Sequence, residues 1–95
     1  MVIWTKPARD DLKSIHDYIK EDSEFYAERV VELIVEKTES LPNFPRRGRK
    51  VPEFENDSIR EIKVYSYRLI YEISNGDIII LTIVHSARDF LSSRQ

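Results

Sequence analysis

The sequence predicts an α+β fold in which an N-terminal strand and an antiparallel helical hairpin precede an antiparallel β-meander. Three observations predict it: apolar residues recur at helical spacing over 7–41, strand formers fill 59–85, and Asn75-Gly76 interrupts that second region. With 95 residues, of which 41% are hydrophobic, the chain is long enough for one core and too short for two. We therefore expect a single domain spanning residues 1–95.

The first half begins with a short strand predicted over Val2–Thr5. A helix is predicted over Pro7–Lys20, because proline suits the first helical turn and Thr5 is suited to cap it. Within this segment apolar residues recur with the period of a helix, at Ala8, Leu12, Ile15 and Ile19.

A second helix is predicted between a cap at Asp22 or Ser23 and the helix breaker Pro42. Its apolar stripe is Ala27, Val30, Val31, Ile34, Thr38 and Leu41. The connection between the two helices is short, so they should form an antiparallel hairpin that covers the apolar face of the meander. We also expect a single helical turn over Ala87–Ser93.

The register of the meander follows from two turns. Asn75-Gly76 predicts a two-residue hairpin with both residues at positive φ, which pairs Ser74 with Asp77, Tyr71 with Ile80, Leu69 with Thr82 and Arg68 with Ile83. A weaker turn at Tyr65-Ser66 places Lys63 opposite Arg68. Because side chains alternate, the core face should carry Ile62, Val64, Tyr67, Leu69, Tyr71, Ile73, Ile78, Ile80, Thr82 and Val84. The other face should carry Ile59, Glu61, Lys63, Arg68, Ile70, Glu72, Ile79, Leu81, Ile83 and His85.

That second face contains a candidate site for an anion. Lys63 and Arg68 are unfavourable neighbours unless a negative group joins them, and an internal acid or a phosphate would serve. With His85 within about two rungs, the three side chains suit phosphodiester cleavage in RNA, which needs a base, a cation and an acid. Two structural alternatives stay open: Glu61 and Glu72 pair with the two cations, and His85 is a strand-end side chain with local hydrogen bonds.

The charge of the chain is unevenly distributed. The net charge is -2, yet residues 1–45 carry 6 basic and 10 acidic residues whereas residues 46–95 carry 9 and 7. An anionic partner should therefore approach the C-terminal half. Its candidate contacts are Arg46, Arg47, Arg49, Lys50 and Arg60, and the alternative is that this loop is simply solvated.

Several classes of site are not expected. The chain has no cysteine, its two histidines, His16 and His85, lie on different predicted elements, and it has only two glycines. We expect neither a metal nor a nucleotide cofactor. The apolar run over 78–84 is far shorter than the roughly 20 residues of a membrane helix, so a cytoplasmic protein without a membrane partner is expected.

Three strings resemble toxins of the RelE/ParE superfamily, the growth-arresting halves of type II toxin-antitoxin modules. They are GRKVPEF at 48–54, IREIKVYSYRLIYEI at 59–73 and IVHSARDF at 83–90. The similarity extends to the opening WTKPARDDL and covers nearly the whole chain. The resemblance implies a helical hairpin on an antiparallel sheet and a cognate antitoxin that neutralises the toxin in a hetero-oligomer. We expect that antitoxin to lay an apolar segment on the hairpin or sheet edge, with acidic groups near Arg46–Lys50.

Two mechanisms occur among the proteins that this chain resembles. RelE-like members cut messenger RNA in the ribosomal A site, and Arg68, Lys63 and Arg88 match their basic residues, with His85 as a further candidate. ParE-like members poison DNA gyrase and lack a complete nuclease set. Phe90 stands where a proton-transferring tyrosine is sought, and the VPEF and HSARD strings look more like ParE-type plasmid stabilisation proteins. We therefore predict a gyrase-directed toxin, with an mRNA endoribonuclease or an inactive antitoxin-binding module as alternatives.

Overall fold

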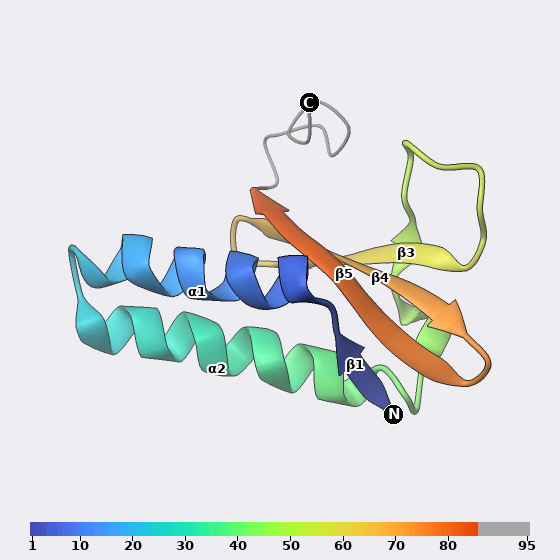
Figure 1. Ribbon diagram of the computed structural model, residues 1–95, viewed down its shortest axis with the longest axis horizontal. Helices are drawn as coiled ribbons and strands as arrows, with labels where there is room; N and C mark the ends of the chain where they lie inside the picture. The colour runs from blue at the N-terminus through green and yellow to red at the C-terminus, as the bar shows by residue number, and fades with distance from the viewer. Residues whose placement is uncertain (86–95) are drawn as a thin grey trace.

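The computed structural model describes residues 1–85, which build one five-stranded sheet and two helices (Figure 1). The order of the strands across the sheet is β1-β5-β4-β3-β2. All neighbouring strands are antiparallel except β1, which runs parallel to β5. In chain order the elements are β1 (Val2–Trp4), α1 (Lys6–Lys20), α2 (Glu24–Ser40), the 3-10 turn η1 (Pro45–Arg47), β2 (Arg49–Lys50), β3 (Ile59–Val64), β4 (Tyr67–Ser74) and β5 (Asp77–His85).

Side-chain caps start both helices, as predicted. The Thr5 hydroxyl accepts a hydrogen bond from the Ala8 N–H at 3.2 Å, and the Ser23 hydroxyl accepts one from the Tyr26 N–H at 3.1 Å. The helices form an antiparallel hairpin packed on the sheet. Their apolar stripes meet the sheet in one core cluster, Ala8, Ile15, Val30, Ile34, Leu41, Val64, Leu69, Tyr71, Ile78, Ile80 and Ile83. The predicted α+β architecture is confirmed, whereas the predicted turn over 87–93 lies outside the described residues.

Both turns of the meander are where the sequence predicts them. Asn75 and Gly76 have φ of 51° and 82°, the combination that the two-residue hairpin requires. Tyr65 also has a positive φ, 55°, and the turn that it starts sets Lys63 opposite Arg68. These predicted pairings are therefore confirmed.

A β-bulge changes the predicted register in the second half of β5. Tyr71 pairs with Ile80 as predicted, but Ile70 pairs with Thr82, so Leu81 is an extra residue. The predicted pairs Leu69–Thr82 and Arg68–Ile83 are wrong, because the shift sets Leu69 against Ile83 and Arg68 against Val84. Ile83 accordingly joins the core cluster. The prediction had placed Thr82 and Val84 on the core face instead, and Ile83 on the other face.

The bulge lies where β5 loses a neighbouring strand and meets α1. β1 pairs with β5 only as far as Ile80, so the following residues form an edge. Asp11 of α1 covers that edge: its carboxylate accepts hydrogen bonds from the Ile83 N–H at 3.0 Å and from the Thr82 hydroxyl. These two bonds satisfy an edge donor and fix α1 against β5.

Candidate functional site

Arg68 lies at the centre of a buried ionic cluster. Only 5% of the residue is exposed, and its guanidinium donates to Glu61 through Nε at 2.8 Å and Nη2 at 2.5 Å. It also grips both carboxylate oxygens of Glu53, from Nη1 at 3.0 Å and from Nη2 at 2.8 Å. These bonds use most of the five N–H donors that an arginine has.

A second arginine completes this cluster. Glu61, which is 2% exposed, uses its other oxygen to accept from Arg49 Nε at 2.7 Å. Arg49, Glu53, Glu61 and Arg68, here called the arginine–glutamate cluster, thus join β2, the following loop, β3 and β4 with a formal charge of zero. The hydrogen bonds of Glu53, and then those of Glu61, raise the pKa of Arg68 against the lowering effect of burial. The guanidinium therefore stays charged and neutralised inside the protein.

The negative group predicted to join Lys63 and Arg68 is thus an internal acid. Glu61 pairs with Arg68, as the structural alternative expected. The sequence did not predict the second acid, Glu53, because it lies in a loop whose path the strand register does not fix; the VPEF string is the only local signal for it. Lys63 is exposed at the edge of this region.

His85 does not belong to this site, and its predicted placement beside Lys63 and Arg68 is wrong. The bulge sets it opposite Tyr67, on the other face of the sheet from Arg68. There its ring meets that of Tyr67 edge to face, with centroids 5.9 Å apart. Arg88 and Phe90 lie outside the described residues, so the structure does not place them.

The predicted anion-binding residues, in the basic loop of residues 46–50 and at Arg60 of β3, largely bond to other groups of the protein. Arg49 belongs to the cluster, Lys50 forms an ion pair with Asp57 at 2.8 Å, and Arg60 donates to the Gly48 carbonyl at 2.9 Å and the Arg46 carbonyl at 3.4 Å. Arg47 donates to the Ser40 hydroxyl at 3.1 Å. The hydrogen bond from Lys50 lowers the pKa of the Asp57 carboxyl. Arg46 is the remaining member, exposed in η1. Their use as a binding surface stays a prediction.

Tyr71 anchors the same loop from inside the core. Its hydroxyl donates to the Pro45 carbonyl at 2.7 Å and accepts from the Gly48 N–H at 3.0 Å. The residue is fully buried. These bonds satisfy two backbone groups of the loop and hold it beside the arginine–glutamate cluster.

This contact predicts a dependence of stability on alkaline pH. Burial raises the pKa of Tyr71 above its ordinary 10.0, so its contribution is complete below about pH 10 and is lost as the pH rises through the folded-state value. Tyr71→Phe should lower the free energy of unfolding by about 1–2 kcal/mol at pH 7, and its stability should then fall less than that of the wild type as the pH rises above about 10. Urea unfolding measures both, with exposed Tyr65→Phe as control. An unchanged alkaline response in Tyr71→Phe would contradict this assignment.

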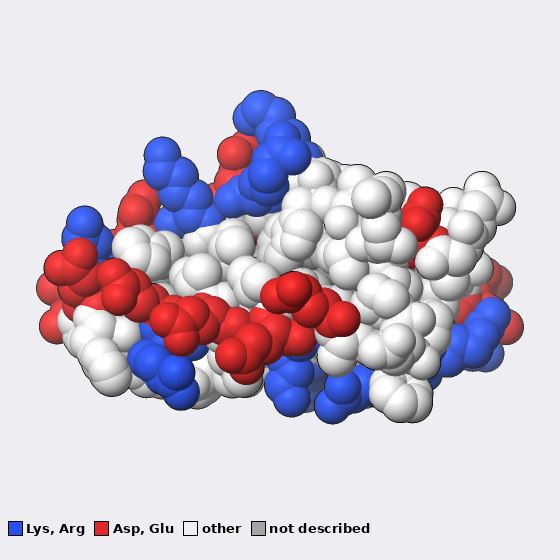
Figure 2. Space-filling view, turned by 90° about the horizontal axis from the view of Figure 1, so that it is seen from below, with Lys and Arg blue, Asp and Glu red and all other residues white. Residues whose placement is uncertain are grey.

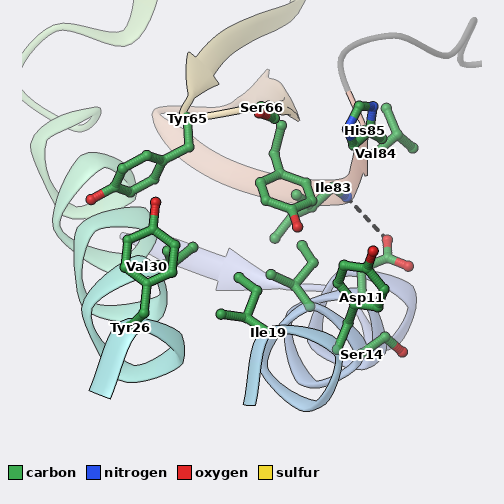
Figure 3. A pocket seen from close by; sticks show the side chains of 13 residues that line it. Asp11, Ser14, Ile19, Tyr26, Val30, Tyr65, Ser66, Ile83, Val84 and His85 are labelled. Carbon is green, nitrogen blue, oxygen red and sulfur yellow. Dashed lines mark hydrogen bonds between the residues drawn. The ribbon is translucent and has the colours of Figure 1, made fainter. Parts of the chain in front are cut away.

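A groove opens between the ends of the helices and the turn between β3 and β4 (Figure 3). Its volume is about 920 Å³, and four tyrosines from three elements and a turn surround it: Tyr18, Tyr26, Tyr65 and Tyr67. The rings of Tyr26 and Tyr65 meet edge to face with centroids 6.1 Å apart. Its apolar lining comes from Ile15, Ile19, Val30, Ile83 and Val84, its other polar lining from Asp11, Ser14, Ser66 and His85, and no lysine or arginine is among the described residues that line it. This tyrosine groove suits an apolar or aromatic segment of a partner and does not suit a phosphate.

No cluster of three or more possible metal ligands occurs among residues 1–85. Within the same range, neither helix is long and apolar enough to cross a membrane.

The comparisons with known proteins agree with this fold. The model of the family described as the ParE toxin of the type II toxin-antitoxin system, parDE, matches residues 2–90. The chain belongs to the ParE toxin family. It is 34% identical over 88 residues to the toxin RelE2 of Caulobacter vibrioides, covering 92% of this chain and 96% of that relative. This ParE-family chain is therefore a type II toxin, and the resemblance to the RelE/ParE superfamily is confirmed.

Solved structures support the same conclusion. The chromosomal ParDE system of P. aeruginosa gives a TM-score of 0.72 at 25% identity, covering 88% of this chain and 92% of that one. The RelBE2 toxin-antitoxin complex of Mycobacterium tuberculosis gives 0.67 at 25% identity, covering 90% and 95%. The isolated E. coli RelE toxin gives 0.59 at 15% identity, covering 99% and 92%, which is a likeness of fold.

Proposed function

We propose that this ParE-family toxin arrests growth by binding DNA gyrase rather than by cutting RNA. The observation that carries the proposal is the enclosure of Arg68 by two carboxylates, on the opposite face of the sheet from His85. RNA cleavage needs a cation that is open to the phosphate and a proton-transfer group next to it. Here the guanidinium is already neutralised, and Glu53 and Glu61 would repel a phosphate that approached it. Poisoning gyrase needs only a binding surface.

The experiment compares two assays on the same purified toxin. In a gyrase assay we expect loss of supercoiling and accumulation of cleaved, gyrase-bound DNA as toxin is added. In a translation extract we expect transcripts to remain uncut. Gyrase that is untouched at toxin concentrations well above its own would reject the proposal.

The alternative is a ribosome-dependent endoribonuclease. It is supported by the RelE name of the 34% identical relative and by exposed Lys63, which lies directly opposite Arg68. Transcripts cut only in the presence of ribosomes would establish it. An inactive antitoxin-binding module is the third possibility, and harmless overexpression of the free protein would favour it.

We further propose that a cognate antitoxin neutralises the toxin by laying an apolar segment in the tyrosine groove. Three observations support this: Tyr18, Tyr26 and Tyr65 are 72%, 51% and 51% exposed, apolar side chains such as Ile19 and Val30 line the groove with them, and the ParDE and RelBE2 relatives were solved as toxin-antitoxin systems. Acidic antitoxin groups are expected near Arg46–Lys50, where the basic residues are exposed.

Co-purification with the product of the adjacent gene tests this partner. Tyr26→Glu should weaken the complex about tenfold or more, because it places a charge in an apolar contact. Phe25→Glu is the matched control, since Phe25 is the preceding residue, is 67% exposed and does not line the groove. Equal effects of the two variants would remove the groove from the interface, and insensitivity to Arg46→Glu would remove the acidic contacts.

A further inference from the structure

A second groove runs along the outside of the helical hairpin, between α1 and α2. It is open, has a volume of about 490 Å³, and no residue of the arginine–glutamate cluster lines it. Its apolar lining comes from β1 and both helices: Trp4, Leu12, Val31 and Val35. All four side chains are only partly buried, so the hairpin leaves apolar surface uncovered here.

The two walls of this groove carry opposite charge. α2 has five acidic and two basic residues, and the acids form an exposed row beside Val31 and Val35: Glu24, Glu28, Glu32, Glu36 and Glu39. α1 has four basic residues, Lys6, Arg9, Lys13 and Lys20, against three acids: Asp10 pairs with Lys6 at 2.9 Å, Asp11 is bonded to β5, and Asp17 is exposed. Figure 2 shows a row of acidic side chains on one side of an uncharged strip, and basic side chains with some acidic ones among them on the other.

We propose that this face binds a second copy of the same chain. Two limiting orientations of the two-fold axis are possible when two copies meet face to face. An axis across the helices sets α1 on α1 and α2 on α2, so acid meets acid. An axis along the hairpin sets α1 of each copy on α2 of its partner, so each basic wall meets an acidic wall and the two apolar strips meet between them. The surface is complementary to itself only in the second arrangement.

The hairpin geometry identifies the opposing charges. The helices are antiparallel about the turn at 21–23, so Lys13 lies level with Val31 and Arg9 with Val35, in agreement with the four sharing one groove. In the dimer, Lys13 of one copy therefore faces Glu32 of the other, twice by symmetry, and adds to the pair that Glu32 makes with Arg29 of its own helix at 3.3 Å. The groove is small compared with stable dimer interfaces, and exposed ion pairs are weak, so the dimer should be transient and sensitive to salt.

Sedimentation velocity of the full chain from ~10 µM to ~1 mM tests the proposal. The wild type should pass from monomer to dimer within this range. Lys13→Glu and Glu32→Lys should each weaken dimerisation about tenfold or more, because each turns two attractive pairs into repulsive ones. Mixing the two variants should restore a dimer, since every opposed pair is then of opposite sign. Lys63→Glu, an equal charge reversal on β3, is the matched control and should leave dimerisation unchanged.

Circular dichroism is the control that each variant is folded. A chain that stays monomeric over the whole range overturns the proposal, as does a dimer that is indifferent to both variants or a mixture that remains monomeric. Protection of this groove by an antitoxin alone, without self-association, overturns it as well. The measurement is independent of gyrase or RNA activity, so its outcome does not depend on the proposed function.

Discussion

Replacing Arg68 by methionine is expected to lower the free energy of unfolding by about 3–5 kcal/mol. The substitution preserves most of the apolar volume but leaves Glu53 and Glu61 buried without their main counter-charge. Glu61 keeps Arg49, whereas the Glu53 carboxylate loses its two hydrogen bonds from Arg68. Urea unfolding at pH 7 measures the loss.

Lys63→Met is the matched control, because Lys63 occupies the same rung of the sheet but is exposed. It should change stability by less than about 1 kcal/mol. Equal stability of the two variants would contradict the structural role of Arg68. The expected difference also affects the interpretation of toxicity assays. An Arg68 variant that fails to arrest growth must be shown to be folded before its failure is assigned to a lost catalytic group.

Gly48→Ala is expected to cost about 2–3 kcal/mol through overpacking. A Cβ at this position would lie 2.6 Å from the Glu61 carbonyl oxygen and 2.7 Å from the Tyr71 hydroxyl oxygen. The backbone angles of Gly48, φ -73° and ψ 157°, suit any residue, so the effect is steric. The loop must move away from β3 and lose the Tyr71 anchor, which thermal or urea unfolding would detect.

Two comparisons sharpen this prediction. Gly76→Ala meets no atom within 4 Å but has φ of +82°, so its smaller cost, about 1 kcal/mol, comes from backbone strain alone. In a Tyr71→Phe background, Gly48→Ala should cost less than in the wild type, because one of the two close contacts is gone. A wild-type stability for Gly48→Ala would show that the loop does not approach β3 as described.

The parts of the fold that the sequence predicted depend on local signals. Asn75-Gly76 determines a hairpin almost alone, and the caps at Thr5 and Ser23 act within three residues. The bulge at Leu81 has no such signal. It occurs where β1 ends and Asp11 of α1 bonds to β5, a contact between residues about seventy positions apart. A register extrapolated from the turn cannot include it.

The candidate site could likewise be predicted only where a nearby turn determines the register. Lys63 and Arg68 lie opposite each other because the nearby Tyr65 turn determines their pairing. His85 was misplaced because it lies beyond the bulge, where one extra residue reverses the two faces of a strand. Glu53 was missed because loops have no periodicity, and only tertiary structure brings its carboxylate to Arg68.

Growth arrest by the double variant Lys63→Ala/His85→Ala tests the central claim most directly. Both side chains are exposed, so the fold should survive, and together they are the described residues that a nuclease mechanism would still need beside Arg68. A gyrase-directed toxin whose Arg68 is structural should arrest growth as the wild type does, with cleaved gyrase-bound DNA accumulating in the cells. Normal growth of cells that contain the folded double variant, together with wild-type toxin that cuts transcripts, would contradict the account.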